Sequence, residues 1–97
     1  SSGGSLRSNT NVPKIRFRRS AKRELFELDD DAFLRVARAI LELQDNPRPR
    51  GYDKVAGRPD QLRIWAGRDY RVLYEMDEQA GRIVIVAVRK KDESTYK

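Results

Sequence analysis

The run Ile83-Val84-Ile85-Val86-Ala87-Val88 limits the possible folds of this chain more than any other feature, because it is apolar at every position. A continuous apolar run of this length is typical of a central strand that is covered on both faces. A chain of 97 residues, of which 38% are hydrophobic, can bury one modest core. We therefore predict one domain built on a sheet in which residues 83–88 form an interior strand.

Three further segments are predicted to be strands. Residues 14–18 and 61–66 alternate between apolar and polar residues, which marks strands with one wet face, and residues 70–76 form a run that is largely apolar around Arg71. Gly67-Arg68-Asp69 is typical of a turn between the second and third of these segments, and residues 77–81 predict another turn before the apolar run. Residues 46–60 are rich in proline and glycine, which predicts a basic loop.

Two helices are predicted between the first strand and this loop. Ser20 is placed to cap the first helix, and Asp29-Asp30-Asp31 opens the second, where carboxylates favour the positive end of the helix dipole. Asn46-Pro47 ends the second helix. The short link between the helices predicts an antiparallel hairpin. The apolar residues at helical spacing are Ala21, Leu25 and Leu28 in the first helix and Phe33, Val36, Ala37, Ile40 and Leu41 in the second.

Together these elements predict an α+β fold of order βααβββ, in which a two-helix hairpin packs on a small, mostly antiparallel four-stranded sheet. Residues 13–97 are expected to form the single domain. Residues 1–12 are rich in Ser, Gly and Asn, which predicts a flexible N-terminal segment whose first residues look like a cloning linker.

The charge of the chain points to a polyanionic partner. Lys and Arg number 21 against 15 Asp and Glu, so the net charge is +6. RNA or DNA matches this surplus better than a membrane does, and solubility alone is the alternative explanation. Cysteine and histidine are absent, which excludes disulfides, thiolate metal sites and imidazole chemistry. With no apolar run long enough to span a bilayer and no signal sequence in view, a cytoplasmic location is expected.

Several ordered motifs resemble the RelE/ParE superfamily of bacterial toxin–antitoxin toxins over residues 14–96. The segment Asp69-Tyr70-Arg71-Val72-Leu73-Tyr74 is closely similar to the D-Y-R-V-L-Y strand of that family. The other similar motifs are Ser20-Ala21-Lys22-Arg23-Glu24-Leu25, Asn46-Pro47-Arg48-Pro49 and Lys54-Val55-Ala56-Gly57-Arg58-Pro59-Asp60.

The resemblance implies a compact toxin that a cognate antitoxin neutralises by wrapping a helix or strand around it. RelE-like members cleave mRNA, usually in the ribosomal A site, so mRNA and the ribosome with its rRNA are expected partners, and DNA is reached only through the antitoxin complex. ParE-like members instead poison DNA gyrase. No cofactor or metal is expected, because the 2′-hydroxyl group of the RNA attacks the adjacent phosphate. Asp29-Asp30-Asp31 is explained as a helix start rather than a metal site.

Arg71 is the first catalytic candidate, since it stands in an otherwise apolar strand and matches the position of the RelE-like catalytic arginine. Its guanidinium group can bind two phosphate oxygens at once and keeps its proton at neutral pH. The alternative explanation is a structural ion pair with Glu75 or Asp69.

Arg63 and Trp65 share one face of the preceding strand, opposite Leu62 and Ile64. Arg63 matches a family lysine that contacts phosphate or transfers a proton, but an arginine is a poor base. Trp65 stands where a second family lysine is expected. It can instead stack on an RNA base; packing against the antitoxin or the edge of the core is the alternative.

The C-terminal candidates are cations followed by a tyrosine, as in RelE-like toxins. Lys90 aligns with a catalytic arginine of the family when counted back from Tyr96, and a shift of one residue gives that role to Arg89. Tyr96 can stack on a nucleotide or, if neighbouring cations lower its pKa, accept the 2′ proton. Lys91 adds a phosphate contact. The alternative is a frayed basic tail.

Remaining cations lie in the loops and near the N-terminus. Lys54, Arg58 and Arg68 are candidates for RNA or ribosome contacts that position without specifying sequence, or are simply solvated loop charges. A second electrostatic patch for the ribosome or the antitoxin is expected from the basic residues Lys14, Arg16, Arg18, Arg19, Lys22 and Arg23.

The leading hypothesis is a toxin that acts as a metal-independent endoribonuclease on mRNA in the ribosomal A site. A ParE-like gyrase inhibitor without nuclease activity is the alternative, and a non-toxic interaction module is the third. The combination of Arg63, Arg71, Lys90 and Tyr96 favours cleavage, because a gyrase inhibitor does not need a terminal tyrosine beside cations.

Overall fold

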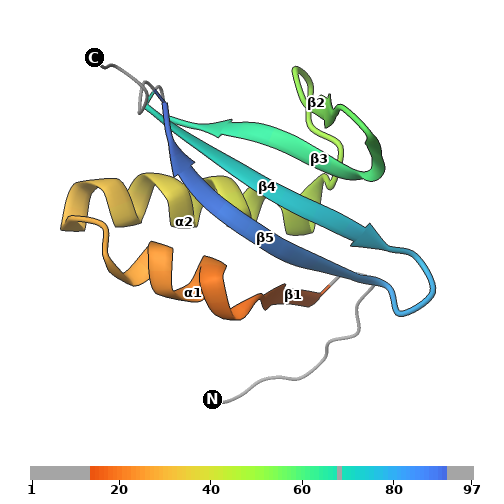
Figure 1. Cartoon of the computed structure of the whole chain (residues 1–97), viewed down its shortest axis with the longest axis horizontal. Helices are drawn as coiled ribbons and strands as arrows, with labels where there is room; N and C mark the ends of the chain where they lie inside the picture. The colour runs from red at the N-terminus through yellow and green to blue at the C-terminus, as the bar shows by residue number, and fades with distance from the viewer. Residues whose placement is uncertain (1–13, 68, 92–97) are drawn as a thin grey trace.

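The computed structural model describes residues 14–67 and 69–91, which form two helices and five strands (Figure 1). The predicted flexible segment at residues 1–12 lies outside the described residues. The elements in chain order are β1 (Lys14–Phe17), α1 (Arg19–Phe26), α2 (Asp30–Asp45), β2 (Asp53–Val55), β3 (Arg58–Ala66), β4 (Tyr70–Asp77) and β5 (Arg82–Lys90).

The strands form one mixed sheet in the order β1-β5-β4-β3-β2. Strand β1 runs parallel to β5, and every other neighbouring pair is antiparallel. The predicted α+β fold is therefore confirmed, with five strands where four are predicted. The extra strand is β2, which lies in the segment expected to be a loop. It forms because Gly57 adopts a φ of 77°, which turns the chain back so that β2 pairs with the start of β3.

The two helices lie together on one face of the sheet, as Figure 1 shows. Strand β5 is interior, between β1 and β4, as its apolar run predicts. The prediction that it is covered on both faces is wrong, because the helices cover only one. Ile83 and Ile85 are fully buried beneath the helices, whereas Val84 and Val86 are half-buried on the other face. We call this uncovered side of the sheet the open face.

Helix boundaries and the buried stripe of α2 differ in detail from the prediction. Helix α1 begins at Arg19, so Ser20 lies inside it and is not the cap. Asp30 and Asp31 occupy the first turn of α2, and the helix ends before Asn46, as predicted. Leu41, expected in the core, is 59% exposed. The stripe that faces the sheet is Ala32, Val36, Ile40 and Leu43.

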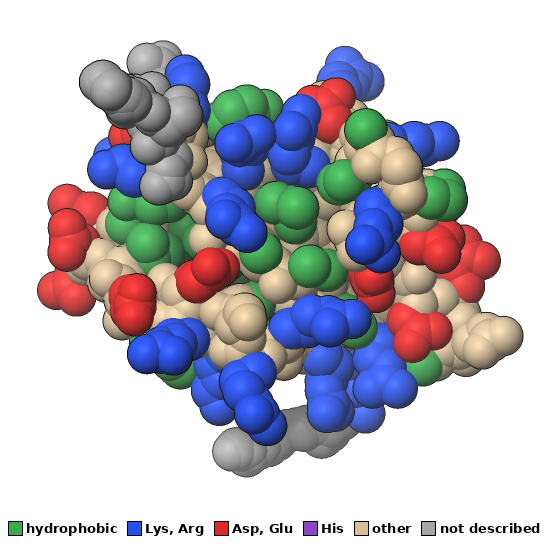
Figure 2. All heavy atoms as spheres, viewed as in Figure 1, with side chains coloured by type: hydrophobic (Ala, Val, Ile, Leu, Met, Phe, Trp, Pro, Cys, Tyr) green, Lys and Arg blue, Asp and Glu red, His purple; other side chains and the backbone are tan. Residues whose placement is uncertain are grey.

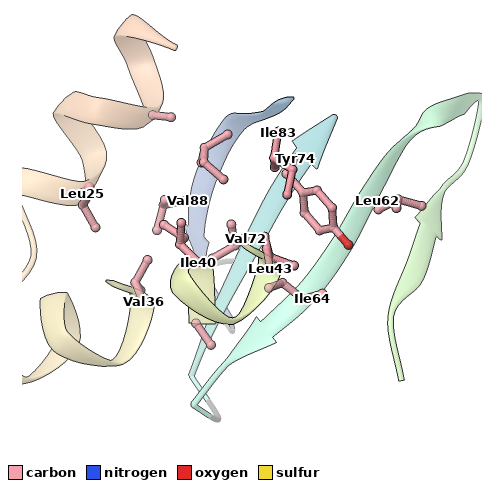
Figure 3. Packing of buried hydrophobic residues seen from close by; sticks show 13 residues of the cluster. Leu25, Val36, Ile40, Leu43, Leu62, Ile64, Val72, Tyr74, Ile83 and Val88 are labelled. Carbon is pink, nitrogen blue, oxygen red and sulfur yellow. The ribbon is translucent and has the colours of Figure 1, made fainter. Parts of the chain in front are cut away.

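The core lies between α2 and the inner sides of β3, β4 and β5 (Figure 3). Tyr74 is its largest fully buried side chain, and its hydroxyl group donates a hydrogen bond of 2.7 Å to the carbonyl oxygen of Pro47. Burial, with a further contribution from Tyr52, raises the pKa of Tyr74 to about 12, against an opposing effect of Arg48. This hydrogen bond attaches the segment after α2 to the middle of the sheet.

Helix α1 is attached to the free edge of β5. Strand β1 pairs with β5 only as far as Ile85, so beyond that point no described strand pairs with this edge of β5. The carboxylate of Glu24 accepts a hydrogen bond of 2.9 Å from the backbone N–H of Val88 there. A side chain of α1 thus satisfies a donor that the sheet leaves unpaired.

Candidate functional site

Burial and strand register show which candidate residues lie on the open face. Leu62, Ile64 and Ala66 of β3 are buried under the helices, so Arg63 and Trp65 point to the other side. In β4, Val72 and Tyr74 are buried, which places Arg71, Leu73 and Glu75 on the open face by the same alternation.

The register brings three candidates into one row across the sheet. Arg71 of β4 pairs with Trp65 on β3 and with Arg89 on β5. The next row along contains Arg63, Leu73 and Ala87. Directly opposed side chains lie about 4.5–5.5 Å apart at their Cβ atoms, so these residues form one cluster, which we call the Arg71 cluster: Arg63, Trp65, Arg71 and Arg89.

Arg71 makes no ion pair with a carboxylate among residues 14–67 and 69–91. Of its two predicted structural partners, Glu75 instead accepts a hydrogen bond of 2.9 Å from Gln61, and Asp69 is exposed. The Nε atom of Arg71 is buried and has no hydrogen-bond acceptor among the residues that the structure describes. A buried donor left in this state costs about 1–3 kcal/mol, which an anionic ligand on the open face can recover.

Arg63 has a carboxylate neighbour that the sequence does not reveal. Asp53 of β2 lies directly opposite, and its Oδ2 is 3.5 Å from Nη2 of Arg63. Both side chains are partly exposed, and exposed pairs of this kind contribute only about 0–1 kcal/mol to stability. The Nε of Arg63, like that of Arg71, is buried without an acceptor. Asp53 therefore orients Arg63 and leaves part of its guanidinium group available.

Trp65 lies among cations on the open face and is 43% exposed. The guanidinium carbon of Arg71 is 5.6 Å from the centre of its ring, and Nζ of Lys91 is 5.9 Å from it. Both distances are within the range of cation–π attraction. Trp65 is thus not part of the buried core, and its ring is accessible on the open face.

The C-terminal candidates separate into two groups. Arg89 lies opposite Arg71 on the open face, whereas Lys90 pairs with Tyr70, which packs against the core on the helix side. Arg89 and Lys90 are both candidates for the position of the family's catalytic arginine, and only Arg89 belongs to the Arg71 cluster. Lys91 lies beside the cluster, next to the ring of Trp65. Tyr96 and Arg68 lie outside the described residues.

The two loop candidates lie away from this cluster. Lys54 pairs with the buried Leu62, so it points to the helix side, where it borders a cavity of about 510 Å³ with Arg48 and Tyr52. Arg58 begins β3, at the end of that strand far from Trp65. Neither residue is brought to the Arg71 cluster.

Two cations on the open face are not part of the predicted site. Lys14 and Arg16 alternate with Ile15, which packs on the core, and they pair with Arg82 and Val84 of β5. The alternation in residues 14–18 is visible in the sequence, but the sequence does not show which strand β1 pairs with. On the open face as a whole, Lys and Arg side chains surround a group of hydrophobic side chains over the strands (Figure 2).

No group of three or more carboxylates among the described residues is arranged to hold a metal ion. No helix in the described ranges is long and apolar enough to cross a membrane. These features define a small, basic α+β protein whose sheet has one uncovered face that carries a cluster of arginines.

Comparison with known proteins identifies the family. The family model described as "ParE toxin of type II toxin-antitoxin system, parDE" matches residues 15–95. The chain belongs to this family, within the RelE/ParE superfamily, and is a toxin of the type found in toxin–antitoxin systems. No curated protein matches it.

Solved structures with RelE names share the fold. The isolated RelE toxin of E. coli has a TM-score of 0.74 at 21% identity, covering 86% of this chain and 88% of that one. For the RelE–RelB complex of Pyrococcus horikoshii OT3 the TM-score is 0.71 at 22% identity, and the match covers 86% of this chain and 99% of that one. For the RelBE2 toxin–antitoxin complex of Mycobacterium tuberculosis the TM-score is 0.70 at 23% identity, and the match covers 82% of this chain and 99% of that one. At these identities the likeness shows the fold alone.

Proposed function

We propose that this toxin is an endoribonuclease that cleaves mRNA in the ribosomal A site and does so without a metal ion. The observation that carries the proposal is the state of Arg71, half-buried on the open face, with no carboxylate partner in the described part of the chain and Arg89 directly opposite. Two arginines that face each other without an acid between them repel, so an anionic ligand between them lowers the energy of both.

A bridging phosphate satisfies this arrangement. Arg71 binds two of its oxygens, and Arg63 and Arg89 approach from the neighbouring strands. These guanidinium groups keep their protons, so they stabilise the charge that grows on the phosphate when the ribose 2′-hydroxyl attacks. Trp65 holds an adjacent base by stacking. The nucleophile belongs to the RNA, so the protein's part is orientation and charge stabilisation.

Proton transfer requires a residue outside this cluster. The guanidinium group of an arginine keeps its proton at neutral pH, so it cannot accept another. Tyr74 is unsuitable as the base because it lies on the helix side and its pKa is raised to about 12. Tyr96, whose place in the sequence resembles that of the tyrosine of RelE-like toxins, is our candidate for accepting the 2′ proton. Lys91, next to Trp65, is a candidate for a phosphate contact.

A cognate antitoxin is the second proposed partner. The structures from Pyrococcus horikoshii and Mycobacterium tuberculosis are, by their titles, a RelE–RelB complex and a toxin–antitoxin complex. The open face is suited to such a partner because it combines exposed apolar groups with cations. An antitoxin that covers the Arg71 cluster prevents RNA from binding there.

Inhibition of DNA gyrase is the alternative function, and the observation that favours it is the name of the matching family, ParE. Brief induction of the toxin in cells, followed by primer extension on a reporter mRNA with and without translation, separates the two. Nuclease activity gives new mRNA ends that depend on translation and on Arg71. Gyrase inhibition gives intact mRNA together with DNA damage, and that result overturns the proposal.

A further inference from the structure

We propose that Lys14 and Arg16 of β1 form a second phosphate-binding subsite, so that a single RNA strand crosses the open face diagonally from Trp65 and Arg71 to the edge of the sheet. The inference rests on the proposed function and extends it from one phosphate to the path of the substrate. It follows from three observations: the shared face, the unbalanced charge and the surface in between.

Lys14 and Arg16 lie on the same face as the Arg71 cluster. Their register partners in β5, Arg82 and Val84, flank the buried Ile83, which points to the helices. Strand β1 is the edge strand, so both side chains are exposed and approachable from the open face and from the side.

The charge of this edge is not balanced by acids. Neither Lys14 nor Arg16 lies within ion-pair distance of a carboxylate in the described ranges. The neighbouring Arg82 is paired with Asp77 at 3.6 Å. Residues 1–13, which precede β1, contain no Asp or Glu. The edge therefore presents two free cations to a polyanion.

The distance between the subsites suits several nucleotides of a single strand. Arg16 lies two strands from β4, in the row of Glu75, and Glu75 is four residues from Arg71. At about 3.3 Å per residue and about 4.8 Å between strands, the Cα positions of Arg71 and Arg16 are roughly 16 Å apart. Two phosphate contacts at this spacing fix both the position and the direction of the strand.

The surface between the subsites is suitable for bases. Leu73, Val84 and Val86 are half-buried there and present apolar side chains. Glu75 lies beside this line, and its carboxylate is already bound to Gln61. Unpaired bases can lie against apolar groups while the cations at each end hold phosphates. In a duplex the bases are already paired and stacked, so they are not available to this surface.

An acidic protein segment is the competing occupant of the edge. Arg16 also borders a groove with Lys22, Phe17 and Phe26, and this mixture of cations and aromatic rings would attract an acidic amphipathic segment. RNA is favoured because Lys14 and Arg16 continue the open face that contains Arg71, whereas this groove lies between β1 and α1.

The test compares two double variants that lose the same charge. Lys14→Ala with Arg16→Ala removes the proposed subsite, and Arg35→Ala with Arg38→Ala removes two exposed cations from α2. Binding is measured by fluorescence anisotropy with 2′-O-methyl RNA, which lacks the free nucleophile and stays intact. A trinucleotide spans the Arg71 cluster alone, and an oligonucleotide of about ten residues spans both subsites.

We expect the β1 variant to bind the longer RNA roughly tenfold more weakly, with a salt slope reduced by about 1.4, while its affinity for the trinucleotide is unchanged. The helix variant is expected to change both affinities equally and slightly. Equal losses in the two variants, or a loss only in binding of the antitoxin, overturn the inference. If wild-type protein binds neither RNA and Arg71→Ala changes nothing, the proposed function fails instead.

Discussion

Arg71 and Trp65 are direct partners across β3 and β4, with the guanidinium carbon 5.6 Å from the centre of the indole ring. This contact holds the cation beside an aromatic surface without neutralising it. An acid in the place of Trp65 would close the site by forming an ion pair. The relationship explains how a charged residue is accommodated in an otherwise apolar strand: the strand has one uncovered face, and Arg71 lies on it.

Replacing Arg71 with alanine is expected to abolish activity and to spare the fold. We predict a loss of at least about 10²-fold in the rate of RNA cleavage, since a preorganised charge at the phosphate is removed. The free energy of unfolding should fall by no more than about 1 kcal/mol, because the loss of the cation–π contact is offset by removal of the buried Nε that lacks an acceptor. Single-turnover cleavage and urea denaturation measure the two effects. A fully active variant, or one that unfolds, contradicts the assigned role.

Trp65 should report RNA binding directly, because it is the single tryptophan of the chain. We predict quenching of its fluorescence when RNA binds, since a base then stacks on the ring. Trp65→Ala should weaken binding of single-stranded RNA by about 1–3 kcal/mol, and Trp65→Phe by less. Fluorescence titration of the wild type and anisotropy of labelled RNA provide the measurements. Quenching by antitoxin but not by RNA would assign Trp65 to the protein interface.

The buried phenol of Tyr74 should make stability depend on pH in the alkaline range. Its pKa is raised from 10.0 to about 12, so the folded state favours the neutral phenol. This stabilisation is fully present below pH 10 and is lost as the pH rises from 10 through 12, a change of roughly 2–3 kcal/mol.

Tyr74→Phe is the matched control for this prediction. It should be less stable at neutral pH by about 1 kcal/mol, because the carbonyl of Pro47 loses its donor. Its stability should then decline less between pH 10 and 12 than that of the wild type. Urea denaturation across this range measures both proteins, and parallel declines would show that other groups cause the dependence.

Leu43 and Leu41 offer a test of the buried stripe of α2. Leu43 is fully buried and Leu41 is 59% exposed, two positions apart on the same helix. Leu43→Ala should destabilise the fold by about 2–5 kcal/mol, and Leu41→Ala by less than about 0.5 kcal/mol. Thermal or urea unfolding of the two variants measures these changes in the free energy of unfolding. Similar losses in both variants would mean that the helix is rotated from the described orientation.

Local patterns were sufficient to predict most of the fold. Alternation predicts the strands at residues 14–18 and 61–66, because successive side chains of a strand point to opposite faces. The continuous apolar run at residues 83–88 predicts the interior strand. Strand β2 was missed because Asp53–Val55 is too short to show a pattern and forms only by pairing with β3. The cover of β5 was misjudged because an apolar run does not show which neighbours it has.

The sequence is sufficient to select candidate residues such as Arg71, but it does not show which residues lie next to them across the sheet. Arg71 stood out as a charge in an apolar strand, and its position opposite Arg89 follows from a register that the sequence does not contain. For the same reason Asp53 was not recognised as the partner of Arg63, and Lys14 and Arg16 were not placed on the open face. One residue of register decides between Arg89 and Lys90, since a single step reverses the face.

The chemistry of the RNA ends tests the central claim most directly. A translated reporter mRNA is incubated with the purified toxin and ribosomes, and the fragments are mapped and their end groups identified. Attack by the 2′-hydroxyl leaves a 5′-hydroxyl on one fragment and a cyclic or open phosphate at the 3′ end of the other. We predict these ends with the wild type and none with Arg71→Ala. Intact mRNA with inhibited gyrase, or fragments that carry a 5′-phosphate, would contradict the account.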